Sequence, residues 1–174
     1  MKALRFMSVL LVAGSPCLAA AAELIVKFHA IDDKGVGEPI GAVLFRDTSM
    51  GLKIVPALQQ LTPGRHGFHV HQNPECGAAL KDGVMAAGQA AGGHYDPAGS
   101  TRHAGPRGAG HLGDLPALDV GMAGIADNVR HAKRLTIAHL KGRSVVIHAG
   151  GDNYSDQPKP LGGGGARIAC GVVP

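Results

Sequence analysis

Short apolar runs bounded by turn residues dominate the hydrophobic pattern of this chain of 174 residues. Residues 24–30 are apolar with partial alternation, and the Asp-Asp-Lys-Gly sequence at 32–35 is typical of a turn. Further short runs of the same kind predict strands at residues 40–45, 52–58, 67–72, 118–120, 131–138, 144–148 and 166–173. Many short strands with turns between them predict one all-β domain, an antiparallel sandwich or barrel.

The stretch from residue 73 to residue 115 breaks this pattern. It is rich in glycine and has neither the period of a helix nor that of a strand. A loop of this length inside a compact domain is either a misassigned element or a functional segment. The composition of 27 Gly with 3% aromatic residues also argues against a helical bundle, because glycine favours turns and shaped loops.

Residues 1–22 have the pattern of a secretory signal peptide. Lys2 and Arg5 precede a short apolar run at residues 6–14, and four alanines at 19–22 offer cleavage sites before Glu23. We expect cleavage after Ala22, with Ala20 as the next choice, export to the periplasm, and a mature domain at residues 23–174. Lipidation at Cys17 is a weaker alternative, because Pro16 stands where such a site needs a small residue.

Charge and cysteine content narrow the picture further. Removal of residues 1–22 leaves 15 of the 17 basic residues against 13 acidic ones, so the mature chain is near neutral and predicts neither nucleic-acid nor membrane binding. Two cysteines remain in the mature chain, Cys76 and Cys170. An even pair in an exported protein predicts one disulfide, and two reduced thiols are the less favoured alternative in an oxidising compartment.

Ten histidines in so short a chain suggest metal binding. On a strand at residues 67–72, His69 and His71 would share one face while Phe68 and Val70 point into the core. Two imidazoles at this spacing form a good half-site for copper or zinc, although the His-x-His pattern alone is weak evidence.

The long loop strengthens the metal hypothesis. It contains His94, His103, His111 and Asp114 in a Gly/Pro-rich context, and three histidines with one aspartate are the right ligand types for tetrahedral zinc. A metal ion there would order a loop that has no core of its own. His148 ends another apolar strand and, taken alone, fits an ordinary strand-end histidine.

Five motifs in order make the chain resemble the copper–zinc superoxide dismutases, and the exported bacterial branch in particular. These motifs are His-Val-His at 69–71, Gly-His-Tyr-Asp-Pro at 93–97, Gly-His-Leu-Gly-Asp-Leu-Pro at 110–116, His-Ala-Gly-Gly-Asp-Asn at 148–153, and Gly-Gly-Gly-Gly-Ala-Arg-Ile-Ala-Cys-Gly at 162–171. The resemblance covers essentially the whole mature chain. It implies a Greek-key antiparallel β-sandwich, or flattened barrel of immunoglobulin-like type, with long metal-binding loops.

The resemblance also implies roles for individual residues. Copper would be bound by His69, His71, His94 and His148. Zinc would be bound by His94, His103, His111 and Asp114, so that His94 bridges the two ions. Asp152 would hydrogen-bond ligands of both metals, Arg167 would attract and orient the anionic substrate, and Cys76 and Cys170 would form the disulfide of the family.

The implied reaction converts two superoxide anions and two protons into dioxygen and hydrogen peroxide by Cu(II)/Cu(I) cycling. Zinc would keep the bridge in place, and His94 would return a proton to the product. A copper or zinc carrier without turnover is the alternative, and such a carrier needs no Arg167, no Asp152 and no bridging His94. Members of the family occur as monomers and dimers, so a homodimer stays open. His29, His66, His131 and His139 fall outside the motifs, and we expect structural or surface roles for them.

Overall fold

The structure, a computed structural model, describes residues 22–174. One antiparallel sheet of seven strands, in the order β5-β10-β11-β1-β2-β3-β9, curls around the core, and two small sheets pair β4 with β8 and β6 with β7. The strands are β1 (Glu23–Asp32), β2 (Gly35–Thr48), β3 (Gly51–Leu58), β4 (Gly64–His66), β5 (Phe68–His71), β6 (Ala79–Lys81), β7 (Val84–Ala86), β8 (Leu118–Val120), β9 (Arg130–Ala132), β10 (Arg143–His148) and β11 (Arg167–Val173). The expectation of an all-β antiparallel sandwich is confirmed.

Between residues 22 and 174, helical structure is limited to single turns. These are the 3₁₀ turns η1 (Gln89–Ala91) and η2 (Leu161–Gly163) and the α-helical turn α1 (Ile137–Leu140). Within residues 22–174, no helix has the length and apolar character needed to cross a membrane. The predicted signal peptide falls on residues 1–22, of which only Ala22 lies in the described part.

The predicted strand at residues 131–138 is wrong. Only β9 is extended there, and the chain then turns into α1. Two local features explain the difference. Thr136 and His139 form a capping box at the start of α1, and Arg134 turns away to donate to the carbonyl of Gly110 at 2.8 Å.

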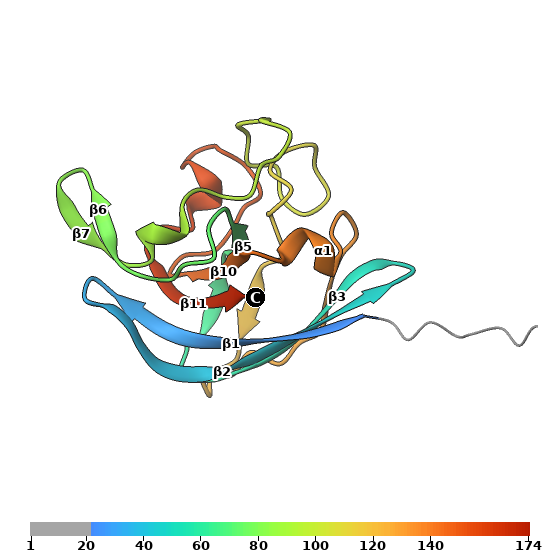
Figure 1. The fold of residues 1–174 in the computed structure, drawn as a ribbon, viewed down its shortest axis with the longest axis horizontal. Helices are drawn as coiled ribbons and strands as arrows, with labels where there is room; N and C mark the ends of the chain where they lie inside the picture. The colour runs from blue at the N-terminus through green and yellow to red at the C-terminus, as the bar shows by residue number, and fades with distance from the viewer. Residues whose placement is uncertain (1–21) are drawn as a thin grey trace, which may run out of the picture.

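Alternating side chains of the strands build the core between the two faces of the curled sheet. Phe28, Phe45 and Phe68 are completely buried in it, and the rings of Phe28 and Phe68 lie 6.2 Å apart. The prediction that Phe68 and Val70 point into the core is therefore confirmed. Figure 1 shows that the long loops gather on the β5 and β10 side of the molecule, away from β1, β2 and β3.

The segment at residues 73–115 is a long loop, with only the β6–β7 hairpin and η1 as regular elements. A disulfide between Cys76 and Cys170 ties its beginning to β11, with 5.7 Å between the two Cα atoms. In the chain-entropy model a cross-link over 94 residues stabilises the folded state by roughly 4–5 kcal/mol. The loop is thereby held against the strand that carries Arg167.

Two glycines on β2 provide a matched test of backbone packing. Gly41 and Gly35 have nearly the same positive φ, +127° and +126°. A Cβ on Gly41 would collide with the carbonyl oxygen of Ala57, whereas a Cβ on Gly35 would meet nothing within 4 Å. We expect Gly41→Ala to lower the free energy of unfolding by about 3 kcal/mol and Gly35→Ala by only about 1 kcal/mol. Urea unfolding of the metal-free, disulfide-intact protein measures both values, and equal losses would show that the collision with Ala57 is relieved at no cost.

Candidate metal centre

The metal-binding face is organised around β5. His69 and His71 are completely buried and point to the same side of this strand. The neighbouring strand β10 pairs with β5 along its length and ends at His148. The main-chain N–H of His148 donates to the carbonyl of Gly67 at 2.9 Å, so the third histidine lies next to the first two.

The long loop pairs with the other edge of β5. The N–H of Tyr95 donates to the carbonyl of Val70 at 2.8 Å, and the N–H of Val70 donates to the carbonyl of Gly113 at 2.9 Å. These bonds place His94 opposite His71 and Asp114 opposite His69. A Cβ at Gly113 would collide with the carbonyl oxygen of Val70, so this approach requires glycine.

The outer ring nitrogens of two histidines are bound to main-chain carbonyls. His71 Nδ1 donates to the carbonyl of Gly92 at 3.0 Å, and His148 Nδ1 donates to that of Gly165 at 3.2 Å. Because a carbonyl can only accept, each neutral ring keeps a lone pair on the opposite nitrogen. With His69 and His94, whose second nitrogens face carboxylates, these rings leave four nitrogens buried without a hydrogen-bond partner: His69 Nδ1, His71 Nε2, His94 Nε2 and His148 Nε2. These histidines form a cluster whose ligand atoms lie within 4.8 Å of one another.

Asp152 joins this cluster to a second one. Its two carboxylate oxygens accept from His69 Nε2 at 2.8 Å and from His103 Nε2 at 2.7 Å. The N–H of Tyr154 also donates to Asp152 at 2.7 Å. A side chain at Gly162 would collide with this carboxylate, and Gly162 has a φ of +70°, so both space and backbone conformation explain part of the tetraglycine segment.

The second cluster surrounds Asp114. One of its carboxylate oxygens lies 3.1 Å from His94 Nδ1 and 3.6 Å from His111 Nδ1. The other lies 3.0 Å from His103 Nδ1 and accepts from the N–H of Ala104 at 3.2 Å. His94 therefore lies between the clusters, with Nδ1 on the Asp114 side and Nε2 in the first cluster.

By the distances between ligand atoms alone, the second group comprises His69, His94, His103 and Asp114, and it does not include His111. Two observations favour His111 in place of His69. His69 Nε2 is already bonded to Asp152, and its remaining lone pair on Nδ1 counts toward the first cluster. His111 Nδ1 is buried without a hydrogen-bond partner and lies on the Asp114 side.

Burial and carboxylates shift the pKa values of the two clusters in opposite directions. Burial lowers the pKa of His71 and His148 well below its usual value and that of His94 to about 4, so these rings are neutral at pH 7. Burial also opposes the charged form of His103, but its bonds to Asp114 and Asp152 outweigh this and raise its pKa to about 9. A neutral imidazole can bind a metal ion without losing a proton, whereas His103 must lose a proton to bind one.

Arg167 lies beside the first cluster. Its guanidinium group donates to the carbonyl of Gly92 at 2.7 Å and to that of Gly88. The carbonyl of Gly92 also accepts from His71, so the arginine is fixed close to that ring. Burial lowers the pKa of Arg167, yet a guanidinium stays charged at neutral pH.

Among the four histidines outside the motifs, only His66 is buried. Its Nδ1 lies 2.7 Å from the carbonyl oxygen of His148, and its Nε2 lies 2.8 Å from that of Thr62. The ring thus supports the end of β10 where His148 sits. The sequence predicted only a structural or surface role for His66, because no ligand motif contains it. The structure brings every predicted ligand together, along with Asp152 and Arg167.

Fold and site together define a β-sandwich with two adjoining histidine-rich clusters fit for two metal ions. Comparison with known proteins agrees, since a model of the copper/zinc superoxide dismutase family matches residues 40–173. A copper–zinc superoxide dismutase of Salmonella typhimurium is 51% identical over 156 residues, 89% of this chain and 90% of the relative.

Solved structures give the same result. The copper/zinc enzyme from Brucella abortus has a TM-score of 0.86 at 46% identity and covers 88% of this chain and 100% of its own. The Salmonella enterica enzyme, described as monomeric, has a TM-score of 0.79 at 51% identity, with coverage of 88% and 100%.

The chain belongs to the copper/zinc superoxide dismutase family. It is an oxidoreductase that dismutes superoxide, with copper and zinc as cofactors, as the sequence predicted.

The raised pKa of His103 predicts proton release on zinc binding. At pH 7.5 the metal-free protein carries a proton on His103, and a zinc ligand must be deprotonated. We expect about one proton to be released per zinc, and the apparent zinc affinity to rise about tenfold per pH unit up to about pH 9. Calorimetry with zinc alone, in buffers of different ionisation enthalpy, counts the protons.

Asp152→Asn is the matched variant for this experiment. It keeps the size of the side chain but removes a charge that raises the pKa of His103, so less proton release is expected. A pH-independent zinc affinity between pH 6 and 8 in the unmodified protein would contradict a protonated His103.

Proposed function

We propose that the first cluster, His69, His71, His94 and His148, binds the copper ion. The argument depends on the four buried ring nitrogens that converge without hydrogen-bond partners. Burying polar atoms unpaired is costly, and a metal ion that accepts all four lone pairs removes this cost. Copper tolerates imidazole ligands in both of its oxidation states.

The second cluster, His94, His103, His111 and Asp114, is proposed to bind zinc. Three imidazoles and a carboxylate are a typical tetrahedral ligand set for this ion. Two ring nitrogens and two main-chain N–H groups from residues 103–111 already contact Asp114, so a bound ion would stabilise this part of the loop. His94 would serve both ions, because its two ring nitrogens face different clusters.

The residues around the copper site suggest how the chain assists the reaction. Bound copper supplies one-electron exchange, which lets one superoxide leave as dioxygen and another as hydrogen peroxide. Arg167 is a fixed positive charge next to His71 that would draw the small anion toward the site. His94 would supply the proton that the departing peroxide takes, held on Nε2 while that nitrogen is not a copper ligand. Asp152 would keep the rings of His69 and His103 oriented.

Arg167→Ala tests the role of the arginine. We expect superoxide turnover at low salt to fall about tenfold, within the range of electrostatic steering, of which this family is itself an established example. The dependence of the rate on ionic strength should flatten, while copper and zinc contents stay unchanged. Pulse radiolysis with metal analysis measures all three, and Arg167→Lys should keep part of the salt dependence.

The contrary outcomes of this experiment separate two hypotheses. An unchanged rate for Arg167→Ala at low salt would remove the steering role. A fully metallated, folded protein with no activity above that of free copper would instead support the metal-carrier alternative.

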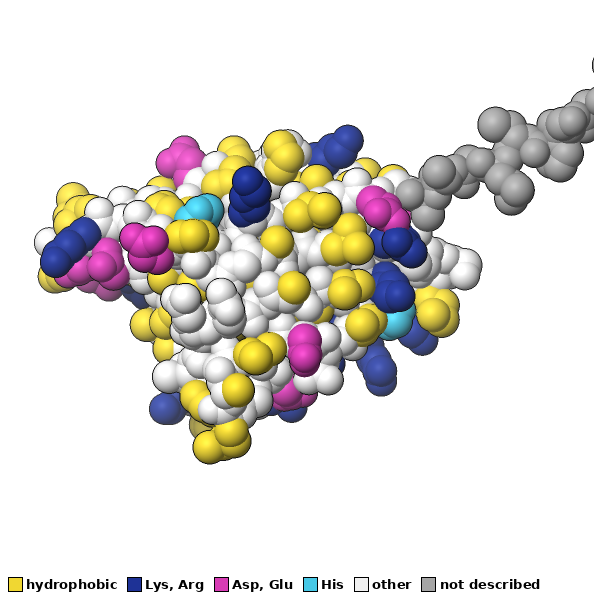
Figure 2. All heavy atoms as spheres, turned by 90° about the horizontal axis from the view of Figure 1, so that it is seen from below, with side chains coloured by type: hydrophobic (Ala, Val, Ile, Leu, Met, Phe, Trp, Pro, Cys, Tyr) yellow, Lys and Arg dark blue, Asp and Glu magenta, His cyan; other side chains and the backbone are white. Residues whose placement is uncertain are grey.

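We also propose that the mature chain works in the periplasm as a monomer. The signal-peptide pattern of residues 1–22 and the Cys76–Cys170 disulfide both fit an oxidising compartment. The solved relative described as monomeric supports a single chain. Ile25 on β1 and Val36 on β2 are exposed apolar residues. Figure 2 shows that apolar side chains on the lower face of the molecule are interspersed with charged ones, which is consistent with a single chain.

Expression of the full chain in a Gram-negative host tests location and assembly together. We expect the protein in the osmotic-shock fraction, an N-terminus at Glu23, and a single-chain mass in equilibrium sedimentation. Retention in the cytoplasm would overturn the location, and a mass twice that of the mature chain would indicate a homodimer.

A further inference from the structure

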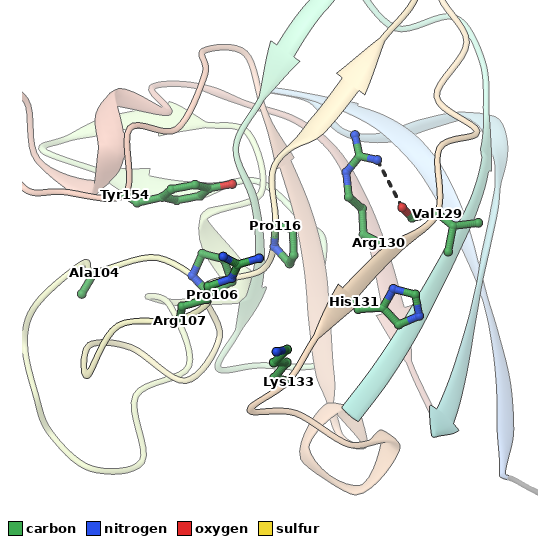
Figure 3. Close-up of a pocket in the computed structure, with 9 residues that line it drawn as sticks. All are labelled: Ala104, Pro106, Arg107, Pro116, Val129, Arg130, His131, Lys133 and Tyr154. Carbon is green, nitrogen blue, oxygen red and sulfur yellow. Dashed lines mark hydrogen bonds between the residues drawn. The ribbon is translucent and has the colours of Figure 1, made fainter. Parts of the chain in front are cut away.

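A cavity of about 560 Å³ lies between the loop at residues 104–107 and the segment at residues 129–133. Figure 3 shows the two walls, with Arg107 on the loop side and Lys133 on the β9 side, and Tyr154 at a third side. None of the proposed metal ligands lines this cavity, and neither does Arg167. The cavity is therefore separate from the copper site.

Positive charge is concentrated in the walls of the cavity. Arg107, Arg130 and Lys133 all line it, and no carboxylate does among residues 22–174. Arg130 is neutralised by Asp119, with 2.7 Å between Nη2 and Oδ2. In the described part of the chain, the side chains of Arg107 and Lys133 make no ion pair, so both charges are available to a ligand.

The remaining walls are apolar. Pro106, Pro116, Val129 and the ring of Tyr154 supply them, and the ring is fixed because its hydroxyl accepts from the N–H of Ala117 at 3.1 Å. The volume lies within the range of small-molecule sites, roughly 300–1,000 Å³, and such sites combine apolar walls with a few charged groups. Inorganic phosphate or chloride alone would leave most of this space unfilled.

We propose that this cavity binds a small organic phosphate, a phosphomonoester that carries a ring or another apolar body. A guanidinium fork pairs with phosphate oxygens in a bidentate manner, and the lysine adds a second point charge, so the pair matches a dianion better than a monoanion. The apolar body would pack against Tyr154 and Pro116. This site is independent of superoxide dismutation.

Three probes separate the features of the proposed ligand. Phenyl phosphate has both the dianion and the ring, inorganic phosphate has only the dianion, and benzoate has the ring with a single charge. Each is titrated at pH 8 into the copper- and zinc-loaded protein, with copper reduced by ascorbate. Amide chemical shifts of residues 104–107 and 131–133 report binding in the cavity. We expect saturable shifts there, with phenyl phosphate binding at least about tenfold more tightly than the other two.

Paired variants provide the control. Arg107→Gln with Lys133→Gln should weaken phenyl phosphate binding by about tenfold or more, because two charge-assisted contacts are lost. Lys34→Gln with Lys81→Gln removes the same formal charge from exposed positions outside the cavity and should leave binding unchanged. Metal content and thermal unfolding establish that both double variants are folded.

The contrary results are equally specific. Shifts confined to residues 88–92 would place the probe at Arg167 and overturn the proposal. Equal affinity for inorganic phosphate and phenyl phosphate would overturn the organic nature of the ligand, and equal affinity for benzoate would overturn the requirement for a dianion. The absence of saturation at 20 mM phenyl phosphate, or equal losses in the two double variants, would exclude the site.

Discussion

The metal centre depends on the hydrogen bonding of β5 along both of its edges. One edge pairs with β10, and the other pairs with two short stretches of the long loop, through the bonds that join Val70 to Tyr95 and Gly113. Because neighbouring strands lie about 4.8 Å apart, this pairing by itself sets ligand side chains at bonding distance from one another. The loop thus gains its order from an existing strand edge, and Gly113 is the residue that permits the approach.

Desolvation is the second constraint on this arrangement. Six buried imidazole rings cannot all be protonated, and each needs a partner for its outward-facing N–H. Carbonyl oxygens serve His71 and His148, which remain neutral, whereas Asp152 serves His69 and His103. Burial would raise the pKa of Asp114 and Asp152, but hydrogen bonds with their histidine partners lower it well below the usual range. Asp114 therefore balances charge within the second cluster, and Asp152 is shared between His103 of that cluster and His69 of the first.

Much of the fold could be predicted from the sequence, because local patterns determine most strands. The turn at residues 32–35 is one example: Asp32 accepts from the N–H groups of Lys34 and Gly35, as an aspartate in a turn commonly does. The prediction of a strand at residues 131–138 was wrong because tertiary contacts, rather than the local pattern, determine the backbone conformation there. Arg134 is held by the carbonyls of Gly110 and His111, which lie more than twenty residues away. No local pattern contains that information.

The proposed metal ligands could be predicted from the sequence for a different reason than the strands. Motif order predicts them, yet the sequence alone does not show which ring nitrogen would face which ion, since that depends on where the second nitrogen finds its partner. His94 illustrates the point: the bridging role proposed for it depends on Nδ1 lying against Asp114 and on Nε2 having no hydrogen-bond partner. His66 illustrates the converse, because a residue outside every motif supports the carbonyl of His148. The cavity at Arg107 and Lys133 was equally hidden, since its walls come from three segments that only the folded chain brings together.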